Sequence, residues 1–279
     1  MYIYSVSRIF KSDSLSIKIN AVLFQDILKI VYAGLSFMLK WSEMKVKLLN
    51  TIMTGSTLLV VIMLFPMGRC ESMNIIKNPE TIKLPNPQYD GLSSVEGALL
   101  KRRSVRSYSK KPLSIDEISQ LLWAAQGITH PRGFRTAPSA GALYPLELYI
   151  VAGNVTNLAD GVYKYKPIQH ELMKIDKGDK RTELCGAALS QRSIKDAPAV
   201  MVFCAVYQRT TVKYGQRGIR YIHMEIGHSA QNVCLQAVSL GLGTVTIGAF
   251  NDKEVKKIVN CDTDEHPLYI MPVGKLQNE

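Results

Sequence analysis

Residues 217–250 read RGIRYIHMEIGHSAQNVCLQAVSLGLGTVTIGAF and contain the longest regular pattern in the chain. Apolar side chains recur at helical spacing from about Arg217 to Leu240, which predicts one long amphipathic helix. Gly241 and Gly243 follow, and we expect them to end this helix and lead into a strand. A Rossmann nucleotide site needs a strand, a glycine loop and a helix in that order, so this helix-first order argues against one.

The rest of the chain predicts a mixture of helices and strands. Two Ser-x-x-Glu segments, Ser93–Glu96 and Ser114–Glu117, are typical of helix starts. Five strand-like runs are Leu146–Ala152, Val162–Tyr165, Ala199–Tyr207, Thr244–Phe250 and Leu268–Val273. Because helices and strands do not alternate strictly, we expect an α+β sandwich of a central mixed sheet with flanking helices.

The composition limits the class of protein. The chain has 279 residues, of which 47% are hydrophobic, enough for a substantial core. The formal charge is +11, but no basic run is interleaved with aromatic residues, so we expect no nucleic acid as partner. A basic nucleic-acid-binding protein remains as an alternative. The five cysteines include no Cys-x-x-Cys pair, so we expect no metal site, and Cys204 and Cys234 are expected to be buried, unpaired thiols.

Residues 1–72 predict an N-terminal leader. Met44-Lys45-Val46-Lys47 precedes an uncharged stretch, 48–68, which is typical of a signal peptide or membrane anchor at about 44–72. Met44 is then the expected start. If the leader is used, we expect the domain to be membrane-anchored or extracytoplasmic, and otherwise cytoplasmic. Residues 73–92 are rich in proline and predict a linker, followed by a folded domain at 93–279.

A polar stripe follows one side of the predicted long helix. Glu225, His228, Asn232 and Gln236 are three or four residues apart, so they share a helix face. This pattern favours a structural hydrogen-bond network, and a role in binding or proton transfer is the alternative.

Two segments suggest a ligand. Arg102-Arg103-Ser104-Val105-Arg106 offers guanidinium groups and a hydroxyl that suit a phosphate monoester, although a solvated basic patch is the alternative. The small residues between Pro138 and Pro145 would let backbone N–H groups approach a flat or anionic ligand, or form an ordinary tight loop. The chain has no P-loop, GxSxG or HExxH motif, so the sequence does not favour a kinase or a hydrolase.

The order of these motifs resembles that of a known family. RRSxR, then PSAGAxYP, then ExGHxxQNxxLxAxxLGLG and a final PVG resemble the nitroreductase-like flavoproteins over about residues 93–276, in particular the SagB-type branch, whose members oxidise azoline rings in peptide maturation. The resemblance implies a homodimer that binds FMN noncovalently at its interface. It also implies hydride transfer over the flavin between a donor, such as NAD(P)H or a peptide azoline, and an acceptor. A flavin-binding or partner-docking protein without turnover is the alternative.

The resemblance also implies which residues hold the cofactor. At the phosphate and ribityl end these are Arg102, Arg103, Ser104 and Arg106, with Lys275 as the basic residue left near the C-terminus. No catalytic side chain is implied, because the flavin carries the hydride chemistry.

At the flavin ring, the resemblance implies contacts from both subunits. Pro138, Ser139, Ala140 and Gly141 of the second subunit would border the isoalloxazine, and backbone N–H groups of Gly248 and Ala249 would face it. Many relatives have Asn-x-Gln-Pro where this chain has Ala142–Pro145, so Tyr144 would stack or hydrogen-bond instead.

Overall fold

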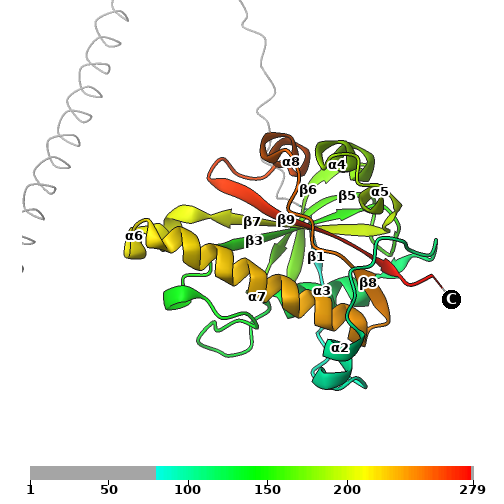
Figure 1. Ribbon diagram of the computed structural model, residues 1–279, viewed down its shortest axis with the longest axis horizontal. Coiled ribbons are helices and arrows are strands. Elements are labelled where there is room, and N and C mark those ends of the chain that lie inside the picture. Colours follow the sequence, from blue (N-terminus) through cyan, green and yellow to red (C-terminus); the bar gives the residue numbers. More distant parts are fainter. Residues whose placement is uncertain (1–79, 278–279) are drawn as a thin grey trace, which may run out of the picture. The chain divides into compact units, whose positions relative to one another are not determined.

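The structure is a computed structural model that describes residues 80–277, within one compact unit, Ile76–Glu279 (Figure 1). The expected leader at 1–72 and the first part of the expected linker lie outside the described residues. In the part of the chain that is described, no helix is both long and apolar enough to span a membrane.

Seven strands form one sheet in the order β1-β6-β5-β3-β7-β9-β8. Their bounds are β1 Thr81–Lys83, β3 Leu146–Ala152, β5 Gly161–Lys166, β6 Glu171–Lys177, β7 Ala199–Val206, β8 Leu242–Thr244 and β9 Glu265–Lys275. A mixed sheet was the wrong expectation, because every neighbouring pair in this sheet is antiparallel. The described parallel strand pair is the short one between β2 (Leu113–Ser114) and β4 (Val155–Thr156), outside this sheet.

Helices cover both faces of the sheet, which gives the expected α+β sandwich. The helices are α2 Val95–Lys101, α3 Ile115–Gln126, α4 Arg181–Ala187, α5 Arg192–Asp196, α6 Tyr207–Tyr214, α7 Arg217–Ser239 and α8 Asp252–Val259. Alternate side chains of β3 and β7 point to opposite faces, and both faces are buried. Leu148 and Phe203 join the core under α3 and α7, whereas Val151 and Val202 join the core under α4, α5 and α8. Figure 1 shows α7 along one side of the sheet and α4, α5 and α8 on the other.

The helix ends follow largely from local sequence. Ser114 caps α3 as predicted, with its hydroxyl accepting from the Glu117 N–H and the Glu117 carboxylate accepting from the Ser114 N–H. At α2 the prediction was one residue early, because Ser94 rather than Ser93 is the N-cap, with its hydroxyl accepting from the Gly97 N–H. The long helix α7 ends at Ser239, and Gly241 adopts φ 69° just beyond it, as expected for a helix-ending glycine.

The segment before α2 is packed on the domain, which corrects part of the expected linker. Strand β1 pairs with β6 at the edge of the sheet, and Leu84 is buried in the core. The Ser119 hydroxyl donates to the Pro85 carbonyl, and the Gln88 N–H donates to the Gln120 side chain at 2.8 Å. Residues 81–88 therefore form an ordered arm on the domain rather than a free linker.

Candidate functional site

The arginine segment is fixed to the edge of the sheet. Ser104 forms a parallel bridge with Thr244 of β8, and the Val105 N–H donates to the Thr244 carbonyl at 2.9 Å. Gly243 makes this approach possible, because a Cβ there would lie 2.6 Å from Val105 Cγ1. The local backbone is thus held firmly, while Arg102 is half-buried and Ser104 and Arg106 are exposed.

The two other basic residues predicted for the phosphate are already engaged. The Arg103 guanidinium donates to the carbonyls of Leu100 and Arg102, so it closes the end of α2. Lys275 lies on β9 and its Nζ is 3.3 Å from the Glu117 carboxylate. By contrast, within residues 80–277 neither Arg102 nor Arg106 forms an ion pair. Arg102 and Arg106 are therefore the better phosphate candidates of the set.

Gly248 and Ala249 lie in a loop, not in the strand that was expected to run to Phe250. Strand β8 ends at Thr244, and Ile247 makes an isolated bridge to Ile270. Both Gly248 and Ala249 are exposed, and their N–H groups have no hydrogen-bond partner among the described residues. The Ala249 carbonyl accepts from the Gln191 side chain at 3.1 Å, which holds the loop. Unpaired N–H groups on a held loop fit an acceptor atom of a flavin ring.

The small-residue loop is also built rigidly. A single 3-10 turn, Ala140–Ala142, contains Gly141 at φ 64°, and Tyr144 is held at φ 46°. The Tyr144 N–H donates to the Ser139 hydroxyl at 2.9 Å, and the Tyr144 carbonyl accepts from Arg209 at 3.1 Å. Pro138 and Gly141 are exposed, and Ser139, Ala140 and Tyr144 are half-buried. The loop therefore presents a preformed surface of small residues next to α6 and α7.

Glu225 lies behind this loop and is only 2% exposed. Burial raises the pKa of Glu225 to about 7, although the neighbouring Ser139 hydroxyl and Arg135 guanidinium oppose the shift. Arg135 donates to the Gln126 side chain at 2.9 Å and lies 4.5 Å from the centre of the Tyr144 ring. Glu225 Oε1, Arg135 Nε and Gln126 Nε2 are buried without a partner among the described residues. Buried polar atoms without hydrogen-bond partners are uncommon in folded proteins, so they distinguish this cluster from the rest of the core.

The remaining polar-stripe residues separate into two groups. Asn232 donates to the Thr136 carbonyl at 3.3 Å, and Gln236 accepts from Gln120 at 3.2 Å, so the structural network is confirmed for them. His228 is exposed and does not join this network. The spacing of three and four residues predicts that the polar side chains share one helix face, but it does not indicate which of them contact the rest of the domain.

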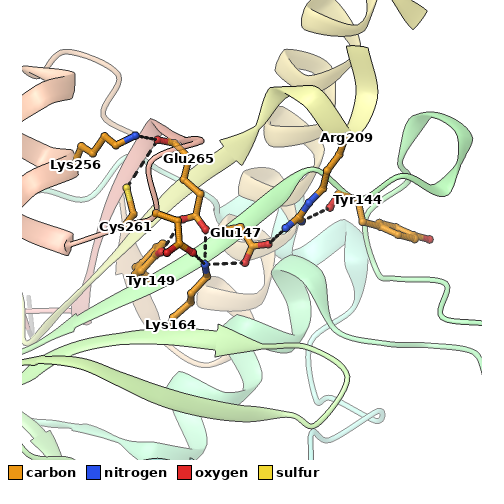
Figure 2. Close-up of polar contacts among 9 residues, drawn as sticks. Tyr144, Glu147, Tyr149, Lys164, Arg209, Lys256, Cys261 and Glu265 are labelled. Atoms are coloured by element: carbon orange, nitrogen blue, oxygen red, sulfur yellow. Dashed lines mark hydrogen bonds and ion pairs between the residues drawn. The ribbon is translucent and has the colours of Figure 1, made fainter. Parts of the chain in front are cut away.

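A buried ion cluster was missed by the sequence analysis. Lys164 of β5 lies between Glu265, Asp262 and Glu147, and its side chain is 6% exposed (Figure 2). Burial alone would lower the pKa of Lys164, but the three carboxylates raise it. Figure 2 shows the chain of contacts continuing from Glu147 to Arg209 and Tyr144. A lysine within the apolar run Val162–Tyr165 was the signal that could have revealed it, because a buried charge needs partners.

The two predicted ligand segments flank α7 within one chain. The Ser139 hydroxyl lies close enough to Glu225 to oppose the rise in the pKa of Glu225. Burial raises the pKa of Cys234, and the nearby Arg102 guanidinium opposes that rise. Glu225 and Cys234 are nine positions apart, so they lie on opposite sides of the helix axis and about 14 Å apart along it. A groove of about 600 Å³ lies between the 88–94 segment, α2, α3 and α7, and none of the predicted cofactor residues lines it. This groove is therefore not the predicted cofactor site.

Comparisons with known proteins agree with this architecture. A family model for the nitroreductase family matches residues 99–275. The chain is 48% identical to putative nitroreductase MJ1384 of Methanocaldococcus jannaschii, covering 70% of this chain and 98% of that protein. It is 30% identical to the microcin B17-processing protein McbC of Escherichia coli, covering 61% of this chain and 65% of that protein.

Two further matches also cover only part of the other protein. An FMN reductase [NAD(P)H] of Bacillus subtilis is 25% identical, with 66% of this chain and 65% of the relative covered. Among solved structures, a putative nitroreductase from Anabaena variabilis superimposes with a TM-score of 0.63 at 32% identity, covering 71% of this chain and 42% of that one. Together with the sheet and the arginine segment described above, these matches show that the chain belongs to the nitroreductase family and is a flavoprotein oxidoreductase.

Proposed function

We propose that the protein binds FMN, with the phosphate at Arg102, Ser104 and Arg106 and the ring beside Gly248 and Ala249. The observation that carries this proposal is the bridge between Ser104 and Thr244. It fixes the arginine segment beside the end of β8, and the loop with unpaired N–H groups begins only a few residues after Thr244. When bound, FMN supplies the hydride chemistry, and the chain supplies position, charge and hydrogen-bond donors. The FMN reductase relative supports the choice of this flavin.

The second half of the site comes from another copy of the chain. Loop 138–144 lies on the other side of α7 from Arg102, which supports a site shared between two subunits. Large apolar side chains on and before α2 are exposed, including Leu92, Leu99 and Leu100. Exposed apolar side chains gathered in one segment are typical of an interaction surface. A homodimer would cover them.

Flavin retention tests the phosphate grip. We expect Arg102→Ala combined with Arg106→Ala to purify with little of its visible flavin absorbance, because two charge-assisted contacts to the phosphate are lost. Lys253→Ala combined with Lys257→Ala removes the same charge from the exposed surface of α8 and should keep the flavin. A folded arginine double variant with full FMN occupancy would remove this segment from the site.

The electron donor is either a nicotinamide or a peptide azoline. The McbC relative, named as a microcin-processing protein, supports a peptide substrate, and the FMN reductase relative supports NAD(P)H. In an anaerobic cuvette, bleaching of the flavin by NADH or NADPH would assign the nicotinamide role. Bleaching by an azoline-containing peptide alone would assign peptide dehydrogenation. A flavin that none of these reduces would favour a flavin-binding protein without turnover.

The subunit arrangement has its own test. We expect Leu100→Asp to shift the protein towards monomer in sedimentation velocity and to lower flavin occupancy in parallel, since Leu100 is 74% exposed on α2. Ile168→Asp places the same charge at a similarly exposed position in the β5–β6 turn and should leave the dimer intact. A monomeric wild-type protein that holds FMN would contradict the shared site.

A further inference from the structure

Two cysteines that are far apart in sequence meet beside the ion cluster. Cys204 lies near the end of β7, and Cys261 lies in the turn after α8. Their sulfur atoms and a carboxylate oxygen of Glu265 all lie within 4.8 Å of one another. Both thiols are free, Cys204 is fully buried, and Cys261 is half-buried. The predicted burial of Cys204 as a free thiol is confirmed, but nothing in the sequence indicated that Cys261 would be its neighbour.

The surroundings do not favour a metal ion at these three groups. Glu265 already receives hydrogen bonds from Lys164 and, at 2.6 Å, from the Tyr149 hydroxyl. A second ammonium, that of Lys256, donates to the Glu265 backbone carbonyl at 2.8 Å (Figure 2). A divalent cation would have to displace Lys164 from Glu265 and tolerate Lys256 nearby, so the carboxylate is a poor ligand here. The chemistry left is that of the two thiols.

The two thiols have different environments. The pKa of Cys261 is lowered, first by a hydrogen bond from Cys204. Burial raises the pKa of Cys204, so its thiol stays protonated. A partly exposed thiol that ionises readily, next to a protected second thiol, is the arrangement found in reactive cysteine pairs. Cys261 is the group that a small oxidant can reach first.

Both cysteines lie where the regular backbone pattern is interrupted. The register between β7 and β9 breaks between Phe203 and Cys204, so Cys204 lies at an irregular place in the ladder, opposite Pro267. Cys261 follows Asn260, which ends α8 in a left-handed conformation with φ 48°. A turn and a bulge accommodate small shifts more easily than a regular strand or helix does.

We propose that Cys204 and Cys261 form a reversible redox pair that a hydroperoxide converts to a disulfide. The Cys261 thiolate attacks one oxygen of hydrogen peroxide, so that an S–O bond forms, the O–O bond breaks, and the leaving hydroxide takes a proton to become water. The Cys204 thiol then attacks the Cys261 sulfur, so that the S–S bond forms and the sulfenic oxygen leaves as a second water. The two thiols lose two electrons, which reduce the peroxide. A dithiol reductant reverses the reaction.

The test uses the full chain and hydrogen peroxide. After a few equivalents of peroxide, we expect the intact protein to lose the mass of two hydrogens. Alkylation in denaturant should then find two fewer free thiols, and peptide mapping should find a disulfide-linked pair containing Cys204 and Cys261. Dithiothreitol should restore both thiols. Cys234 lies in the core under α3 and α7, whereas Cys185 of α4 lies in the same core as Cys204. Both serve as internal controls and should be alkylated once the protein is unfolded. Unchanged thiols at both positions after peroxide would overturn the proposal, as would linkage of Cys261 to Cys185 or Cys234.

Variants test the separate roles of the two thiols. In Cys204→Ala, Cys261 has no resolving partner, so it should take up two or three oxygen atoms at peroxide doses that give the disulfide in the wild type. In Cys261→Ala, Cys204 should stay reduced, because peroxide does not reach it. Equal overoxidation of Cys261 in the wild type and in Cys204→Ala would show that Cys204 does not resolve it. If Cys204→Ala does not fold, the peptide map of the peroxide-treated wild type still shows whether Cys204 and Cys261 become linked.

Discussion

Replacing Lys164 with methionine should destabilise the domain strongly, because Lys164 compensates a buried carboxylate. The Lys164 and Glu265 side chains are 6% and 2% exposed. Removing one partner of a buried ion pair costs about 3–5 kcal/mol, since the other charge is left without compensation. The other two carboxylates lose little, because Asp262 is 73% exposed and Glu147 keeps Arg209 at 2.6 Å. Glu265 also keeps the Tyr149 hydroxyl at 2.6 Å, so we expect the lower end, about 3 kcal/mol.

Urea unfolding at equilibrium measures this loss, and two further variants interpret it. Lys174→Met removes a lysine from the neighbouring strand β6, where its partner Glu80 is 60% exposed, and should change stability little. Lys164→Met combined with Glu265→Gln should recover much of the loss, because the uncompensated charge is gone. The pH dependence has a definite sign. Burial raises the pKa of Glu265, and without Lys164 it rises further. The folded variant then holds a proton on Glu265 that the unfolded chain releases. The variant's loss of unfolding free energy relative to the wild type should therefore increase as pH rises from acid towards neutral.

Two results would refute this reasoning. One is a Lys164→Met variant that unfolds at the same urea concentration as the wild type. The other is a double variant that is no more stable than Lys164→Met alone, because the deficit would then come from packing rather than from the stranded charge.

Three other predictions concern single sites. The pKa of Glu225 is raised to about 7, so the folded protein should lose stability as pH rises from about 4.5 to 7, by at most about 1.4 kcal/mol per pH unit. Glu225→Gln should abolish this slope in urea titrations at several pH values, and an unchanged slope would mean that Glu225 ionises normally. Gly243→Ala places a Cβ 2.6 Å from Val105, so it should lower the free energy of unfolding by about 1–3 kcal/mol and reduce flavin absorbance. The control Gly186→Ala in α4 meets nothing within 4 Å and should be neutral or slightly stabilising. Equal effects of the two variants in thermal unfolding would contradict the close approach of Gly243 to Val105. Ser114→Ala removes the N-cap of α3 and should cost about 1 kcal/mol in urea unfolding, while Ser114→Thr, which keeps the hydroxyl, should cost less; equal losses would argue against the cap.

Local sequence signals predicted the elements that local physics controls. Helix α7 was placed to within one residue of its end, and β3 was placed with its observed bounds, because periodic burial and helix caps depend on neighbouring residues. The order of motifs also predicted the family and the α+β class. The expected strand from Thr244 to Phe250 failed after Thr244, since only the Ile247 bridge to β9 continues the pairing there. The residue pattern of a strand does not reveal how long its partner stays beside it.

By itself, then, the sequence determined the helices, the main strands, the basic segment and the family. Tertiary structure decided which distant residues became neighbours. The arginine segment packed along β8, where Ser104 forms a parallel bridge with Thr244. Strand pairing added β1 to the edge beside β6, and the fold placed Lys164 among three carboxylates. It also brought Cys204 to Cys261. These contacts join segments that no local periodicity connects. They depend on strand order and on how helices pack across the sheet, and these properties belong to the whole fold.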